Sequence, residues 1–300
     1  MTLYSNKNGE LVEINEKPFK LEKEIQNVFE QNLNKVMALT LVCSEFTIKN
    51  RRIDTLAFDE SSNAFVIIEY KRDRNISVID QGFTYLGLML ENKADFIVEY
   101  NEQLRLNLKR DQVDWSQTRV IFVSPSFTDF QIEATNFKDI AIELWEIKQY
   151  ADGLIAINEI KKSKGAESIK PLAQQSKEIK QVVDEIHVYT EDQLLANTSV
   201  EIAELYEKFK TAILNLATNI EIKPLKYYVA FKRHSNVVDI EIQKKALKIF
   251  INARWGAIDD SKGIARNVSS IGKTGNGDYQ IQVESDADLE YIMSLIKQVL

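Results

Sequence analysis

The sequence predicts an α/β (α+β) protein in which a mixed central sheet is flanked by helices and followed by a second, smaller α+β domain. The first observation is an amphipathic helical stretch, 19–37, that precedes three successive strand-like runs and a second helical stretch. The second is a polar segment, 161–180, in which no apolar period survives. We therefore expect one domain over 1–160, a linker over 161–180 and another domain over 181–300.

The composition is that of an ordinary globular protein: 44% of the residues are hydrophobic and 28% are charged. No apolar run is long enough to span a bilayer, and the N-terminus lacks the apolar centre of a signal peptide. The single cysteine, Cys43, excludes an intramolecular disulfide and a cysteine-based zinc site, and its apolar neighbours predict a buried thiol. Two histidines exclude a His-rich metal site. We expect a cytoplasmic protein without a membrane partner.

The elements of the first domain follow from periodicity. Residues 4–17 predict a short hairpin or arm, and 19–37 predict a helix whose apolar residues recur at helical spacing. The later elements, in order, are strands at 39–49, 51–59 and 65–71, a helix at 76–92, strands at 95–100 and 118–124, a helix at 127–137, and strands at 140–147 and 154–160. Asp152-Gly153 between the last two strands is a hairpin turn signal.

The stretch 52–72, RIDTLAFDESSNAFVIIEYKR, contains the candidate chemistry. Two apolar runs flank the polar turn 59–63, which predicts a β-hairpin. Side chains i and i+2 of a strand share a face, so Glu69 and Lys71 point the same way and Tyr70 points to the other side. Pairing across the hairpin brings Asp54 beside Glu69.

Two carboxylates and a lysine in this arrangement suit phosphodiester chemistry. Hard carboxylate oxygens hold Mg²⁺, which keeps several waters and lowers the pKa of a bound water. The ammonium group of Lys71 stabilises developing negative charge. The alternative interpretation of these three residues is a solvated strand end with a salt-bridged charge cluster.

Asp54 with Glu69-x-Lys71 resembles the motif of the PD-(D/E)XK nuclease superfamily, and Gln81-x(3)-Tyr85 on the next helix resembles its RecB-type branch. The resemblance covers about residues 19–125, with additions up to 160. It implies a restriction-endonuclease-like core, a Mg²⁺ (or Mn²⁺) cofactor held by Asp54 and Glu69, and catalysis by Lys71. Ile53 stands where the name of the superfamily has proline.

The resemblance also implies supporting residues. Gln81 and Tyr85 are candidate substrate-binding residues, because the helix of this branch lies beside the metal site and touches the nucleic-acid backbone. Arg72, directly after Lys71, is a third candidate substrate-binding residue. The family's first helix often supplies a further acid, for which Glu30 is our first choice and Glu24 the second. The alternative for either acid is a solvated helix face, and the alternative for Tyr85 is packing.

These residues predict a Mg²⁺-dependent endo- or exodeoxyribonuclease that hydrolyses phosphodiester bonds in DNA, in repair or in defence against foreign DNA. A homodimer is expected because cutting both strands often needs two sites. The alternative function is a non-catalytic nucleic-acid-binding or protein-interaction module on a nuclease-like fold. The choice between DNA and RNA, and between ends and flaps, stays open.

The second domain is expected to contain a helix at 199–218, strands at 226–231, 237–242, 246–251 and 279–283, and a final helix at 286–300 capped by Asp286. It resembles an uncharacterised domain found behind nuclease-like domains. Residues 226–273 hold ten basic and four acidic residues, a net charge of +6, although the whole chain carries −7. The candidate phosphate contacts are Lys232, Arg233, Lys244, Lys245, Arg254 and Lys273. A lesser candidate is His234, and Trp255 is expected to be packed rather than stacked on a base. Gly272-Lys273-Thr274 predicts a turn rather than a phosphate loop, which would need glycine in place of Asn267.

Overall fold

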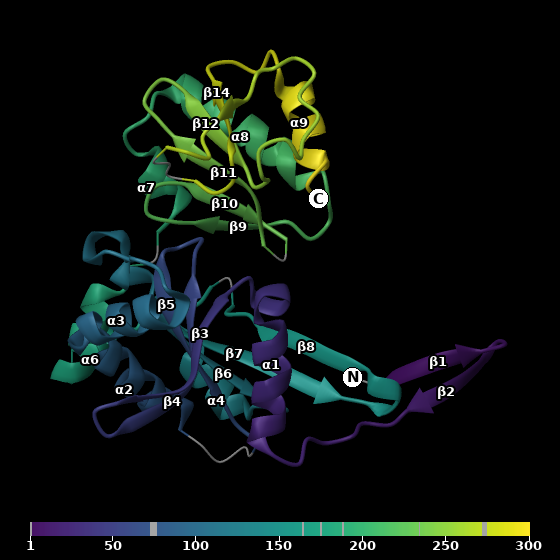
Figure 1. Cartoon of the computed structure of the whole chain (residues 1–300), viewed down its shortest axis with the longest axis vertical. Helices are drawn as coiled ribbons and strands as arrows, with labels where there is room; N and C mark the ends of the chain where they lie inside the picture. Colours follow the sequence, from purple (N-terminus) through teal and green to yellow (C-terminus); the bar gives the residue numbers. More distant parts are fainter. Residues whose placement is uncertain are drawn as a thin grey trace. The chain divides into compact units, whose positions relative to one another are not determined.

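The chain forms two compact units, Met1–His187 and Val188–Leu300 (Figure 1). The computed structural model describes residues 2–72, 77–163, 165–174, 176–187, 189–233, 235–271 and 275–300, with the backbone alone at 177 and 178. Among these residues, no helix combines the length and the apolar character needed to cross a membrane.

The first unit is built on a six-stranded mixed sheet with the order β3-β4-β5-β6-β7-β8. The strands are β3 (Thr40–Ile48), β4 (Arg51–Asp59), β5 (Ala64–Tyr70), β6 (Arg119–Ser124), β7 (Ile142–Gln149) and β8 (Ile155–Ile160). Strands β5, β6 and β7 run parallel, and the other neighbouring pairs are antiparallel. The predicted mixed central sheet is therefore confirmed.

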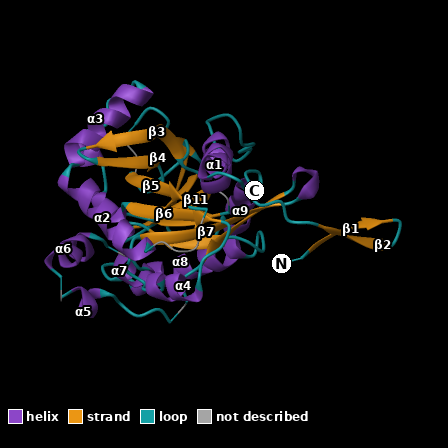
Figure 2. Ribbon diagram, turned by 90° about the horizontal axis from the view of Figure 1, so that it is seen from below, coloured by secondary structure: helices purple, strands orange, loops and turns teal. Residues whose placement is uncertain are grey.

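Helices cover this sheet on both faces, because its central strands are apolar on both sides. Helix α1 (Glu22–Met37) packs with Ile68 and Tyr70 of β5 in one core. Helices α2 (Val78–Glu91) and α3 (Lys93–Leu104) pack with Phe65 and Ile67 in the other. Figure 2 shows α1 on one side of the strands and α2 with α3 on the other. Helix α4 (Asp129–Thr135) begins with a capping box between Thr128 and Gln131.

The strand expected at 95–100 is wrong, because these residues belong to α3. Phe96 and Tyr100 lie four residues apart and face the sheet, where Phe96 contacts the rings of Phe46 and Phe65. The apolar run Phe-Ile-Val suits a strand locally, but the spacing of its buried residues follows a helical period.

The linker expected at 161–180 is also absent from the described part of that segment. Helices α5 (Lys170–Ala173) and α6 (Lys177–Glu185) join the core of the first unit through Val182, Val183 and Ile186. The first unit therefore continues to His187 rather than ending at 160. The apolar positions of α6 lie mostly beyond residue 180, so a window that ended there contained mainly polar residues.

The N-terminal arm is confirmed as a two-stranded sheet of β1 (Leu3–Lys7) and β2 (Glu10–Ile14). Backbone hydrogen bonds of 2.7 Å from Lys17 N to Gln149 O and 2.9 Å from Ala151 N to Asn15 O attach its base to the β7–β8 turn. That turn contains Asp152 and Gly153, both at positive φ, as the hairpin signal predicted.

The second unit is a six-stranded antiparallel sheet with the order β13-β14-β12-β11-β10-β9. The strands are β9 (Glu221–Pro224), β10 (Val229–Lys232), β11 (Asn236–Ile242), β12 (Leu247–Ile251), β13 (Arg266–Asn267) and β14 (Tyr279–Val283), and the helices are α7 (Glu191–Leu195), α8 (Val200–Leu214) and α9 (Leu289–Lys297). Helices α8 and α9 share its core. The predicted cap Asp286 is wrong: Asp288 precedes α9, and Asp286 forms an ion pair with Lys208.

Candidate active site

The predicted site lies where β4 and β5 end. The paired residues of these strands end at Thr55 opposite Ile68, and one more step along both strands sets Asp54 opposite Glu69. Tyr70 points into the core on the α1 side, and Glu69 points toward α2, as the alternation of side chains predicted. The hairpin therefore brings the two acids together.

The Asp54 carboxylate has one strong protein contact. Its Oδ2 accepts a 3.0 Å hydrogen bond from the backbone N–H of Tyr70. Burial and, second, the charge of Glu69 raise the pKa of Asp54 to about 6. Ionisation of Asp54 is therefore costly in the protein alone, and a cation beside it would lower that cost.

The Glu69 side chain is only 5% exposed, and its two oxygens differ. Oε1 accepts hydrogen bonds from Lys71 Nζ at 2.7 Å and Gln81 Nε2 at 2.9 Å. Oε2 is buried and meets no hydrogen-bond donor among the described residues. Because a buried carboxylate oxygen normally has a partner, this atom is a candidate ligand for a cation.

Helix α2 holds Glu69 in place through the hydrogen bond from Gln81. Gln81 Nε2 also donates to the Tyr85 hydroxyl at 3.2 Å, and that hydroxyl donates to Arg52 O at 3.3 Å. Tyr85 is buried, and burial with the charge of Glu69 raises its pKa to about 12. Gly82 allows the close approach of this helix, because a Cβ there would lie 2.4 Å from Ile142 Cδ1.

The structure places Glu30 on a neighbouring hydrogen-bond network. Its Oε1 accepts from Gln26 Nε2 at 2.9 Å and from Thr55 Oγ1 at 2.5 Å, and its Oε2 accepts from Ser44 Oγ at 2.7 Å. No described hydrogen bond joins the Glu30 carboxylate to Asp54 or Glu69. Among the remaining candidates, Glu24 accepts from the backbone N–H of Lys20 near the start of α1.

Arg72 lies beside α1. Its backbone N–H donates to Glu22 Oε1 at 3.0 Å, and its Nη1 donates to Lys20 O at 3.0 Å. These bonds fix the chain directly after Lys71. The guanidinium is therefore engaged with protein in this structure, whereas the sequence assigned it to substrate.

Sequence reasoning missed two neighbours of Asp54. Gln26 is 3% exposed, and its Nε2 donates to Asp54 O at 2.9 Å as well as to Glu30. Glu45 forms ion pairs with Lys23 and Arg52, and its charge adds to the rise in the pKa of Asp54. The sequence did offer one signal for Gln26: it is a polar residue beside Ile25 on the apolar face of α1.

The residues fit a cation that keeps most of its own water. Among the described residues, no group of three or more His, Cys, Asp or Glu side chains converges. Asp54 and Glu69 would therefore supply the protein oxygens, which is the sparse carboxylate coordination that Mg²⁺ favours. Glu69 Oε2, which has no partner among the described residues, would supply one of these oxygens.

The predicted phosphate contacts of the second unit do not form one patch. Lys244 and Lys245 lie in the β11–β12 turn, whereas Arg254 follows the opposite end of β12. Arg233 donates to Asn219 Oδ1 and Leu300 O, and Lys232 is half-buried near Asp239. The proposed contacts Lys273 and His234 and the predicted turn Gly272-Lys273-Thr274 lie outside the described residues.

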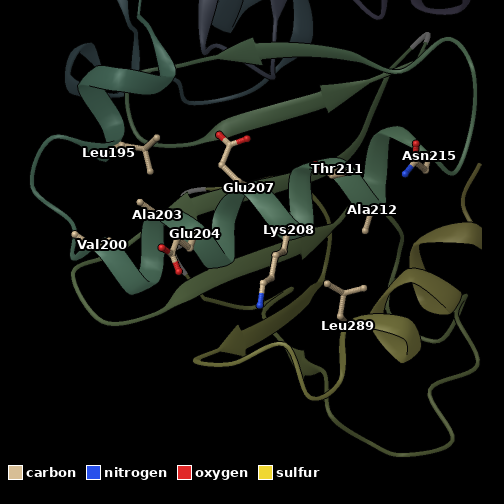
Figure 3. Close-up of a pocket in the computed structure, with 10 residues that line it drawn as sticks. All are labelled: Leu195, Val200, Ala203, Glu204, Glu207, Lys208, Thr211, Ala212, Asn215 and Leu289. Carbon is tan, nitrogen blue, oxygen red and sulfur yellow. The ribbon is translucent and has the colours of Figure 1, made fainter.

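A groove of about 880 Å³ runs along α8 in the second unit (Figure 3). Leu195, Val200 and Leu289 give it an apolar lining, and Glu204 and Glu207 border it. These two acids disfavour a polyanion. We therefore do not assign this groove to nucleic acid.

An uncharacterized protein from Haemophilus influenzae is 55% identical to this chain over 300 residues, which is 100% of this chain and 99% of the relative. Residues 190–298 match the family model described as "Domain of unknown function (DUF5655)". The relative spans both units, and the family model lies within the second.

Three solved structures share parts of the backbone arrangement. A repair endonuclease from Pyrococcus abyssi is 19% identical, with 43% of this chain and 48% of that chain covered and a TM-score of 0.24. An EndoMS–dsDNA complex is 20% identical, with 38% and 40% covered and a TM-score of 0.21. SfsA of Pyrococcus furiosus, in complex with Ca²⁺, is 13% identical, with 54% and 71% covered and a TM-score of 0.28. TM-scores this low leave the functional assignment to the geometry of the site itself.

Proposed function

The chain belongs to the same family as the uncharacterized Haemophilus influenzae protein, and we propose that it is a Mg²⁺-dependent nuclease that hydrolyses phosphodiester bonds in DNA. The observation that supports this proposal most is the buried Glu69 Oε2, which has no described partner and belongs to the carboxylate opposite Asp54. Buried carboxylate oxygens usually have a partner, and a bound cation would supply one here. The resemblance of Asp54, Glu69 and Lys71 to the PD-(D/E)XK motif agrees with it.

Each side chain then has a role that its contacts suit. A bound Mg²⁺ would polarise the scissile phosphate and supply a nucleophilic water. Asp54 and Glu69 hold the cation, and the Lys71 ammonium, 2.7 Å from Glu69 Oε1, is close enough to neutralise charge that develops on the phosphate. Gln81 keeps Glu69 in position through its 2.9 Å hydrogen bond. We therefore assign Gln81 mainly to positioning Glu69, and secondarily to binding substrate.

Glu30, Tyr85 and Arg72 take supporting roles in this proposal. The Glu30 carboxylate fixes Thr55, the neighbour of Asp54, and Gln26 couples it to the Asp54 carbonyl. Tyr85 holds the α2 side of the site through Gln81. Arg72 reaches a phosphate only after leaving Lys20 O, so its contribution to binding is smaller than that of Lys71 to catalysis.

The competing function is a nucleic-acid-binding or protein-interaction module without catalysis. Two neighbouring acids, of which Glu69 is buried and Asp54 half-buried, repel phosphate unless a cation neutralises them, so a phosphate-binding module gains nothing from them. A calorimetric titration with Mn²⁺ separates these functions. A nuclease binds the ion, and Asp54→Asn with Glu69→Gln removes the heat of binding.

The direct test is a cleavage panel of linear, nicked, flapped and single-stranded DNA, and of RNA, with Mg²⁺ or Mn²⁺. We expect Asp54→Asn, Glu69→Gln and Lys71→Met each to lower the rate about 100-fold or more. Glu133→Gln, an exposed acid on α4, is the matched control and keeps the wild-type rate. Cleavage that survives the three variants, or none in the wild-type protein, rules the proposal out.

The same panel tests the expected homodimer. Two cooperating sites convert duplex DNA to a double-strand break without accumulating a nicked intermediate, whereas one site accumulates it. Sedimentation of the protein with DNA then gives the number of copies per duplex.

A further inference from the structure

The second unit presents an aromatic ring to solvent on a fixed base. Trp255 follows β12 and is 45% exposed, although the sequence suggested a packed side chain. Its ring lies 4.5 Å, centroid to centroid, from the ring of Tyr279 at an interplanar angle of 32°. Tyr279 is 2% exposed and belongs to β14. One face of the indole is thus covered by the buried tyrosine, and the exposed area remains for a ligand.

The backbone around this ring is held by hydrogen bonds. Trp255 N donates to Asp278 Oδ2 at 3.0 Å, and the Tyr279 hydroxyl accepts from Gly256 N at 2.7 Å and from Ile258 N at 3.0 Å. Gly256 has a φ of 91°, which favours glycine. The ring is therefore preorganised, so a ligand that stacks on it does not have to order the loop.

Two arginines lie on the segments next to this ring. Arg254 precedes Trp255, and Arg266 pairs with Gln280 at the edge strand β13, one residue from the pair of Asn267 with Tyr279. Both arginines are exposed, and no described residue forms a hydrogen bond or ion pair with the guanidinium group of either. The nearby Asp278 accepts the Trp255 N–H, and Asp260 accepts from Ala265 N and the Tyr291 hydroxyl, whereas Asp259 is exposed.

Strand β13 is the edge of its sheet, so this ring and these cations lie at an open border rather than inside a core. An aromatic face with free guanidinium groups beside it matches a base with its adjoining phosphates. A duplex keeps the faces of its bases covered by stacking, so a side chain at an open edge reaches a base face only where the strand is unpaired.

We propose that Trp255 stacks on an unpaired base of single-stranded DNA, with Arg254 and Arg266 contacting the phosphates next to it. This inference rests on the proposed nuclease function, for which it specifies the substrate class: DNA with a single-stranded segment. The ring supplies a sequence-tolerant contact, since every base has a π face, and the arginines supply the salt-sensitive part of the affinity.

The test is binding of the full-length chain, carrying Asp54→Asn to prevent cleavage and kept in EDTA, to a fluorescent 20-nucleotide oligo(dT). We expect Trp255→Leu to weaken binding about tenfold and Trp255→Phe to keep most of it, because a stacked base contributes on the order of 1–3 kcal/mol. Arg254→Gln and Arg266→Gln should each reduce the log–log salt slope by about 0.7. Thermal melts confirm that each variant is folded.

Two controls separate stacking from other causes. An abasic oligomer of the same length should bind the wild-type chain and Trp255→Leu equally, and a blunt duplex should show no dependence on Trp255. Equal binding of oligo(dT) by the wild-type, Leu and Phe chains overturns the inference, as does binding of a protein partner with no affinity for DNA. Trp255-dependent binding by a wild-type chain that cleaves no DNA would uphold this inference and defeat the nuclease proposal.

Discussion

Each unit buries a carboxylate, and the two are satisfied differently. Asp239 in β11 is fully buried, and its oxygens accept from Asn236 Nδ2, Asn276 N and Asn276 Nδ2. Glu69 in β5 is almost as buried, but its Oε2 meets no donor among the described residues. Burial raises the pKa of Asp239 to about 7, so burial and a shifted pKa are common to structural and functional acids. The unpartnered oxygen separates Glu69 from Asp239, and the neighbouring Asp54 and Lys71 separate Glu69 from Glu241, whose Oε2 is also buried without a described partner.

The largest expected effect is the loss of the Asp239 carboxylate. Asp239→Ala leaves the Asn236 and Asn276 donors buried without acceptors, and we expect it to lower the free energy of unfolding of the second unit by about 3–5 kcal/mol. Urea unfolding followed by near-UV circular dichroism measures this loss. A decrease of less than about 1 kcal/mol would show that the hydrogen bonds accepted by the buried Asp239 contribute little to stability.

The pH dependence of the second unit is the next effect. The folded-state pKa of Asp239, about 7, lies above its ordinary value of 3.8, so between these values the folded unit holds a proton that the unfolded chain has lost. The contribution of Asp239 to stability is therefore greatest below about pH 4, falls as the pH rises to about 7, and then levels off. We expect about 2 kcal/mol less stability at pH 7 than at pH 5.

The control for this dependence is Asp239→Asn, which has no proton to lose. Its amide can donate to Asn236 Oδ1, which is buried and has no described partner. We expect the variant to flatten the slope between pH 5 and 7 while the first unit keeps its own profile. An unchanged slope in this variant would assign the pH dependence to another group.

The candidate site was predictable from the sequence where it depended on strand geometry. The alternation within β5 places Glu69 and Tyr70 on opposite faces, and the turn after Asp59 fixes the register that sets Asp54 against Glu69. The bond between Gln81 and Glu69 was not predictable, because it depends on how closely α2 approaches β7 at Gly82. The unpartnered oxygen of Glu69 is likewise a tertiary property.

The fold was less predictable where a short apolar run could form either a strand or a helix and its neighbours in the sequence did not decide between them. Phe96 and Tyr100 belong to a helix whose face is defined by the aromatic residues it meets, such as Phe65 of β5. The sequence predicts a linker at 161–180 because the apolar residues of α6 that join the core, Val182 and Val183, lie just beyond that segment. A truncation after residue 170 would therefore remove part of the first core. Trp255 is exposed because Tyr279 occupies the buried position beneath it.

A smaller effect is expected when the support of Glu69 is removed. Gln81→Ala deletes the 2.9 Å donor to Glu69 Oε1 and leaves Lys71 as its described partner. Residues that orient a metal ligand usually change metal affinity by tenfold or more, so we expect Mn²⁺ affinity to fall about tenfold. Calorimetry measures it, with Gln103→Ala on α3 as the control, because that glutamine contacts Glu99 instead. An equal loss of Mn²⁺ affinity in both variants would show that Gln81 has no specific role in holding Glu69.

The smallest effect has the opposite sign to the loss at Asp239. In the metal-free protein, burial and the charge of Glu69 disfavour the ionised form of Asp54, so a neutral isostere should relieve that cost. We expect Asp54→Asn to stabilise the first unit by about 1 kcal/mol at pH 8, after allowing for its partial exposure to solvent. Thermal melts in EDTA measure this gain. With Mn²⁺ added, the order should reverse, because the wild-type chain gains stability from ion binding and the variant does not. A variant less stable than the wild-type chain in EDTA would mean that Asp54 is satisfied by protein alone, as Asp239 is.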